Sequence, residues 1–214
     1  MKNIFTVYNK IELLDSLISK DDVVLDIGFW GQGVKFDSEN WPHRLLIERA
    51  MDVYGIDLEY DEEVLPNEDR LKYKKAAAED FQFDKKFDVI FAGDLIEHLV
   101  NPGLFLENAK KSLKPGGRLI MTTPNAFNLF NIAGKITREE PVTNVDHTFY
   151  FNRRTIETLL NKCGWQVAEF GFMYTLDYKI KESFKKKFLN VLYKLVSKFT
   201  PKMYETLIVV ARVG

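Results

Sequence analysis

The stretch that most constrains the fold of this chain is Val23 to Gly33, which reads VVLDIGFWGQG. Its first residues are typical of a buried β-strand, and its glycines mark a sharp turn in which the backbone stays bare. Ligands collect at the carboxyl ends of parallel strands that end in such loops. The stretch therefore predicts an α/β fold with a nucleotide-like ligand beside this loop, although glycine clusters also make ordinary tight turns.

Length and composition limit the alternatives. The 214 residues are 46% hydrophobic and 29% charged, which suits a single α/β domain over 1–214. A net charge of −1 gives no global basic field, so we expect no nucleic-acid partner. The single cysteine, Cys163, excludes an internal disulfide and argues against a cysteine-based zinc site. The N-terminus lacks the apolar core of a signal peptide and no long apolar run follows, so we expect a cytoplasmic protein that does not cross a membrane.

The second strand of the pattern is Asp52 to Asp57, which closes on an acid. In a nucleoside-binding βαβ unit, a carboxylate at this position accepts hydrogen bonds from both ribose hydroxyls of the ligand. Asp57 also suits a turn or a helix cap. With the glycine loop upstream, we interpret it as a ribose-binding residue.

The rest of the chain continues the alternation of strands and helices. Two connections, 126–146 and 174–204, are long enough to be lids or substrate insertions. The patterns predict further strands at 71–75, 87–92, 118–123, 165–171 and 205–213, and helices at 9–19, 41–51, 102–114 and 153–162.

Two stretches carry a family resemblance. Residues 87–125 read FDVIFAGDLIEHLVNPGLFLENAKKSLKPGGRLIMTTPN, and residues 147–165 read HTFYFNRRTIETLLNKCGW. Both resemble class I S-adenosylmethionine-dependent methyltransferases, in particular the small-molecule enzymes of the ubiquinone-biosynthesis group. The resemblance implies a doubly wound, mostly parallel seven-stranded sheet with an antiparallel last strand and helices on both faces. It also implies S-adenosylmethionine as the cofactor and methyl transfer to a small molecule.

The resemblance further implies roles for individual residues. Asp57 would hold the ribose, and the first loop would form the wall against the methionine part of the cofactor. Two departures make the loop less regular than in the family: Phe29 and Trp30 lengthen it, and the distance to Asp57 is longer than usual. The full set of implied cofactor-binding residues is Asp26, Gly28, Phe29, Gly31, Gly33, Asp57, Leu58, Glu79, Asp80, Phe81, Ala92, Gly93 and Asp94.

The three histidines are the candidates for a general base, because only histidine titrates near neutrality without help. His147 follows the long connection and is our first candidate, with His98, beside the cofactor loop, as the second. His43 follows a helix-start proline, and we expect it to be exposed. The ligands for a metal site look too scattered, so we expect a metal-independent enzyme.

Residues 179–199 (KIKESFKKKFLNVLYKLVSKF) predict a basic amphipathic helix. Such a helix either packs on the domain with its lysines in water or contacts an anionic lipid surface. Two other functions stay open from the residues alone: a nicotinamide-dependent oxidoreductase, and a non-catalytic membrane-docking protein. For the methyltransferase, the expected acceptor is a sugar, aromatic or lipid-linked metabolite methylated on oxygen.

Overall fold

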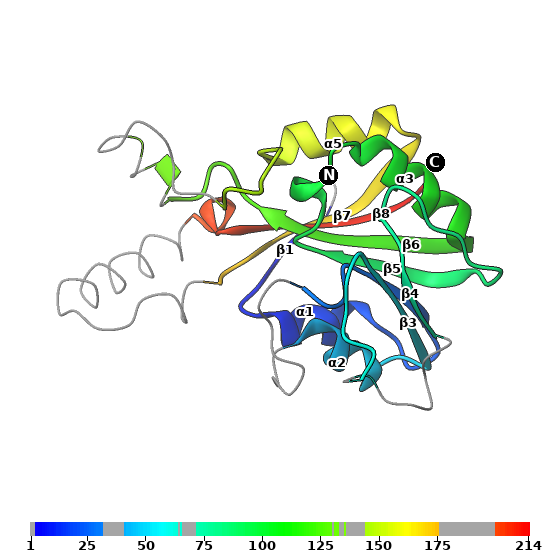
Figure 1. Cartoon of the computed structure of the whole chain (residues 1–214). Helices are drawn as coiled ribbons and strands as arrows, with labels where there is room; N and C mark the ends of the chain where they lie inside the picture. Colours follow the sequence, from blue (N-terminus) through cyan, green and yellow to red (C-terminus); the bar gives the residue numbers. More distant parts are fainter. Residues whose placement is uncertain are drawn as a thin grey trace.

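The eight strands in the described part of the chain form one twisted sheet, shown in the computed structural model of Figure 1. Their order across the sheet is β1-β7-β8-β6-β5-β2-β3-β4. The residues that the structure describes are 3–31, 41–63, 65, 72–129, 131–132, 135, 144–175 and 200–214. The strands are β1 (Asn3–Val7), β2 (Val23–Ile27), β3 (Asp52–Asp57), β4 (Tyr73–Lys75), β5 (Phe87–Gly93), β6 (Leu113–Pro124), β7 (Trp165–Met173) and β8 (Thr206–Val213).

Strand pairing is parallel throughout except at β8, which runs antiparallel to both β6 and β7. This confirms the predicted mostly parallel sheet with an antiparallel last strand. The eighth strand, β1, was not predicted, and it lies at the edge of the sheet beside β7. A strand of five residues is too short to give a clear periodicity in the sequence. Its pairing partner lies far along the chain, so no local pattern indicates the pairing either.

Helices cover both faces of the sheet. Figure 1 shows α3 (Pro102–Ser112) and α5 (Arg153–Lys162) on one face, and α1 (Lys10–Leu17) and α2 (Pro42–Ile47) on the other. The central strands are buried on both sides, as expected for parallel strands. In β5, for example, Ile90 packs in the cluster that contains the α3 and α5 side chains, while Val89 packs with those of α1 and α2.

Local sequence signals explain where several helices begin and end. Asn152 caps α5 through a reciprocal capping box with Thr155, and Gly164, at φ +74°, follows its last turn. The predicted helix 153–162 is therefore confirmed. By contrast, α2 is shorter than the predicted 41–51.

Several predictions fall partly or wholly outside the described residues. These are Gly33, the basic segment 179–199, and most of the two predicted insertions. Within the described part of the chain, no helix is long and apolar enough to span a bilayer.

An aromatic cluster fills the space beyond the carboxyl ends of β2 and β3. Its members are Phe29, Trp30, Trp41, Tyr60, Leu65 and Tyr73. The Phe29 ring lies directly over Gly55 of β3, where a Cβ atom would come within 2.7 Å of Phe29 and 2.9 Å of Tyr73. The position therefore admits only glycine without displacement of both rings.

We predict that Gly55→Ala lowers the free energy of unfolding by about 1–3 kcal/mol, because two buried rings must shift. Urea denaturation measures the change. The matched control is Gly103→Ala in α3, where the nearest atom to the new Cβ is the Asn101 side-chain oxygen at 3.3 Å. It should stay within about 1 kcal/mol of the wild type, since alanine favours helix. Equal stability of the two variants would contradict the packing of Phe29 on β3.

Candidate active site

The glycine loop after β2 makes a bare turn at the carboxyl edge of the sheet. Gly28 and Gly31 both adopt left-handed backbone conformations, with φ of +78° and +63°. The Gly28 N–H donates to the Ile56 carbonyl at 2.8 Å, which ties the loop to the end of β3. A residue with a side chain would be strained at either position. Because both positions are glycine, no side chain keeps a ligand from approaching the backbone here.

Asp57 lies at the end of β3 and faces this loop. Its Oδ2 accepts a hydrogen bond from the Trp30 N–H at 3.0 Å. A carboxylate has further acceptor capacity beyond this bond, which is what a ribose diol requires. Leu58 follows with 70% of its surface exposed, so its side chain is open to a ligand at the same edge.

The Phe29 side chain does not share this openness. It is buried in the aromatic cluster, with ring centroids 5.1 Å from Tyr73 and 5.2 Å from Tyr60. A contribution of Phe29 to ligand binding would therefore come from its backbone.

The loop after β4 holds the residues expected around the adenine. Glu79 is engaged elsewhere, because its Oε1 accepts from the Asn101 N–H at 2.7 Å, next to the start of α3. Phe81 is buried in the main core, while Asp80 is exposed. Contacts of these three residues with a cofactor stay a prediction.

The end of β5 carries the residues expected beneath the methionine end of the cofactor. Ala92 is buried in the core, and Gly93 and Asp94 lead out of the strand. Asp94 adopts φ +51°, a strained value for a residue with a side chain. Thr122 holds it there: its hydroxyl donates to Asp94 Oδ1 at 2.9 Å, and its carbonyl accepts from the Asp94 N–H.

Lys10 reaches this site from the first turn of α1. Its Nζ lies 3.1 Å from Asp94 Oδ2. Sequence reasoning missed this residue because the partners are far apart in the chain and no local pattern connects them.

The structure contradicts the expectation that His43 is exposed. The residue is fully buried, and its Nδ1 lies 2.9 Å from Asp26 Oδ2, while its Nε2 lies 3.0 Å from the Tyr73 hydroxyl. The expectation treated the helix start as solvent-exposed, but the aromatic cluster covers this turn of α2.

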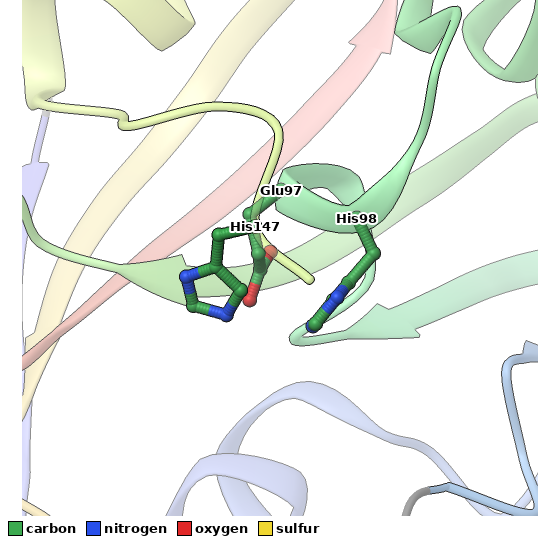
Figure 2. A group of neighbouring side chains, drawn as sticks. All are labelled: Glu97, His98 and His147. Carbon is green, nitrogen blue, oxygen red and sulfur yellow. The ribbon is translucent and has the colours of Figure 1, made fainter. Parts of the chain in front are cut away.

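Glu97, His98 and His147 come together at the same edge (Figure 2). Glu97 and His98 lie on the short 3-10 helix η2 (Ile96–His98), and His147 lies on the segment that enters α5. Thr148 fastens the two segments, since its N–H and its hydroxyl donate to the Glu97 carbonyl at 2.8 and 2.9 Å. The imidazole rings of His98 and His147 then meet edge to face, with centroids 4.6 Å apart.

The electrostatics of this cluster favour neutral forms. Burial, helped by the nearby charge of Asp94, raises the pKa of Glu97 to about 8. Burial, followed by the neighbouring His98, lowers the pKa of His147 below its usual value. Near neutral pH the site therefore holds a mostly protonated carboxyl group beside an uncharged imidazole.

The same three groups could hold a divalent cation. Their ligand atoms all lie within 4.8 Å of one another, and one carboxylate with two imidazoles is a donor set used by zinc and by iron. Glu97 Oε1 and His98 Nδ1 are buried without a hydrogen-bond partner among the described residues. The sequence argument that the ligands are too scattered is therefore wrong for this part of the chain. Glu97 itself was missed as a site residue, although it stands next to His98 in the quoted motif.

Comparison with known proteins agrees with this geometry. A family model described as a methyltransferase domain matches residues 12–169. The chain belongs to the methyltransferase-domain family. The predicted resemblance to class I methyltransferases is thereby confirmed.

Individual relatives of this methyltransferase-family protein are more distant. The ubiquinone biosynthesis O-methyltransferase of Rickettsia bellii is 27% identical over 116 residues, which are 51% of this chain and 48% of the relative. The chain thus spans about half the length of that relative.

Solved structures share the fold. A putative methyltransferase from Bacillus halodurans superposes with a TM-score of 0.59 at 18% identity, covering 94% of this chain and 97% of that one. The 1,6-didemethyltoxoflavin-N1-methyltransferase of Burkholderia thailandensis, solved with S-adenosylhomocysteine, gives 0.60 at 15% identity, covering 95% and 76%.

We predict that Glu97→Gln removes a pH-dependent loss of stability. The folded pKa of Glu97 lies above its unfolded value of about 4.5, so the wild type loses stability as the pH rises from about 4.5 through about 8. Between pH 5 and 8, the free energy of unfolding of the wild type should fall by about 3 kcal/mol more than that of the variant. Glutamine keeps an acceptor for the Thr123 hydroxyl, which now donates to Glu97 Oε2.

Chemical denaturation across this pH range checks the prediction. Parallel stability curves for wild type and variant would contradict the raised pKa.

Proposed function

We propose that the protein transfers a methyl group from S-adenosylmethionine to a hydroxyl oxygen of a small molecule. The observation that carries this proposal is the placement of the Glu97–His98–His147 cluster at the same sheet edge as the glycine loop and Asp57. Membership of the methyltransferase-domain family and the partial match to ubiquinone biosynthesis O-methyltransferases support it. The acceptor class is a sugar, aromatic or lipid-linked metabolite, as the sequence suggested.

The shape of the first loop supports this cofactor over a nicotinamide dinucleotide. A pyrophosphate needs a helix N-terminus directly after the loop, where the backbone N–H groups face the anion. Among the described residues, which leave out 32–40, the next helix after Gly31 is α2, which begins at Pro42. S-adenosylmethionine carries no phosphate, so it needs only the bare turn and the carboxylate of Asp57.

Methyl transfer is an in-line displacement, so the protein must hold the acceptor oxygen in line with the methyl carbon and the sulfur. Positioning of this kind can lower a barrier by roughly 7–11 kcal/mol. As the oxygen attacks, its proton must leave. His147 can accept this proton, because its lowered pKa leaves the imidazole uncharged near neutral pH. The hydrogen bonds from Thr148 hold the segment that carries His147 against η2.

A membrane role for residues 179–199 lies outside the described residues and stays a prediction, as does the cytoplasmic location.

The first test concerns the cofactor. Asp57→Ala should weaken S-adenosylmethionine binding by about 10- to 100-fold, because the ribose hydroxyls of the cofactor lose a charged hydrogen-bond acceptor. Isothermal titration calorimetry measures the affinity. Asp61→Ala, also an acid in the loop that follows β3 and exposed, is the matched control and should bind as the wild type does. Unchanged affinity of the Asp57 variant would remove the ribose role.

The second test concerns the base. His147→Gln should lower kcat by about 10²- to 10⁴-fold, while S-adenosylmethionine binds with unchanged affinity. In the wild type, kcat/KM should rise with pH to a plateau, with its midpoint below pH 6.5, because the neutral imidazole is the active form and its pKa is lowered. Release of S-adenosylhomocysteine with a panel of phenolic, sugar and lipid-linked acceptors provides the assay.

An activity that is insensitive to His147→Gln would refute the base assignment. Absence of turnover with every hydroxyl acceptor, together with turnover on amines, would refute O-methylation.

A second candidate keeps the same reaction but uses a bound divalent cation at the cluster. The unpartnered Glu97 Oε1 and His98 Nδ1 favour it. A cation would supply Lewis-acid stabilisation of the acceptor alkoxide. Dialysis against a chelator separates the two: retained activity supports the metal-independent route that the sequence predicted, and loss with recovery on adding Mg²⁺, Mn²⁺ or Zn²⁺ supports the cation. Metal content of the wild type and of His98→Gln, measured directly, gives a readout that does not depend on turnover.

A further inference from the structure

His43 lies outside the set of residues that the proposed reaction uses, yet it is a fully buried polar group at the cofactor edge. Its side chain is 0% exposed, and Asp26 is 3% exposed. Both ring nitrogens have partners, Asp26 Oδ2 at 2.9 Å and the Tyr73 hydroxyl at 3.0 Å. A histidine with two buried partners is held in a single orientation.

Asp26, the hydrogen-bond partner on β2, decides which ring nitrogen of His43 carries the proton. An ionised carboxylate only accepts hydrogen bonds, so Nδ1 donates to Asp26. Nε2 then faces the Tyr73 hydroxyl, which can donate to it. The bond to Asp26 uses Oδ2, and within the described residues Oδ1 has no hydrogen-bond partner.

Asp26 stands among the charges of the cofactor edge. The neighbouring groups that act on its pKa are His43, Asp57 and Lys10. Burial raises the pKa of Asp26, whereas the hydrogen bond from His43 opposes that rise. His43 thus helps Asp26 to remain an anion one residue before the strand gives way to the glycine loop.

The aromatic cluster keeps this pair in place. The ring of His43 packs against Phe29 at 4.8 Å and Trp41 at 5.1 Å between centroids. The Trp41 indole N–H donates to the Phe29 carbonyl at 2.7 Å, which joins the start of α2 to the glycine loop. The position of the histidine is therefore fixed together with the loop that it supports.

We propose that His43 is a positioning residue for the cofactor: its Nδ1–H holds the Asp26 carboxylate so that Oδ1 can receive the ammonium group at the methionine end of S-adenosylmethionine. The proposal rests on the proposed cofactor and adds to it a residue from α2. The ammonium and the carboxylate are complementary in charge, and a carboxylate already oriented by a buried donor need not be ordered again on binding.

Two substitutions separate the donor from the bulk of the ring. In His43→Asn the amide nitrogen takes the place of Nδ1 and can still donate to Asp26, while in His43→Gln the amide group takes the place of Nε2 and reaches toward Tyr73. Both remove the ring from the aromatic cluster. Tyr73→Phe removes the second partner and leaves the bond to Asp26.

Calorimetric titration with S-adenosylmethionine is the test, together with thermal unfolding of each variant. His43→Gln should weaken binding at least about 10-fold, and His43→Asn and Tyr73→Phe should stay within about 3-fold of the wild type. Both His43 variants should lose thermal stability, because both remove the ring, and Asn, which is one methylene shorter than Gln, leaves the larger gap. Equal affinities of the two, or losses of affinity that follow the losses of stability, would overturn the proposal and leave His43 as a packing residue.

A double-mutant cycle keeps the test decisive if His43→Gln folds poorly. With Asp26→Asn in the background, His43→Asn and His43→Gln should bind S-adenosylmethionine equally, because the charge that His43 orients is gone. A remaining difference would contradict the proposal. Failure of the proposed cofactor has a different signature, since the wild type itself would then show no binding.

Discussion

The parallel pairing of β2 with its neighbours β3 and β5 is the constraint on which the site depends. Ile27 pairs with Ile56, and Asp26 pairs with Phe91, so the three strands end at one edge in register. Side chains buried on both faces fix this register, because a slip by one residue would turn every side chain to the opposite face. The bare turn after β2 and the acids after β3 and β5 meet there as a consequence.

The sequence could predict what is encoded locally. The helix 153–162 was readable because its cap, its apolar face and its terminal glycine all lie within a few residues of one another, and the central strands were readable as apolar runs. Contacts across the fold were not readable. The strand β1 exists through its pairing with β7, and His43 is buried by rings from β4 and the first loop. Residues 97, 98 and 147 lie together where Thr148 and Phe149 bind back to the Glu97 carbonyl on η2, from a segment far along the chain.

Acidic side chains lie at this edge in graded degrees of burial. Asp26 and Glu97 are enclosed, and both have raised pKa values for that reason, whereas Asp94 is partly exposed and paired with Lys10. A sulfonium cofactor brings positive charge into such surroundings and loses it when the methyl group departs. Near neutral pH Glu97 is mostly protonated and Asp94 is paired with Lys10, so the acidic groups that would face this charge are partly neutralised before the cofactor binds.

The unpredicted edge strand connects two distant parts of the molecule. From β1 the chain passes through Tyr8 and Asn9 into α1, and the first residue of that helix is Lys10, whose ammonium group meets Asp94. The outermost strand on the β7 side and the loop after β5 are thus coupled through a turn of only two residues. Because Lys10 is the third residue after β1, a displacement of that strand would change the distance between the Lys10 ammonium group and the Asp94 carboxylate.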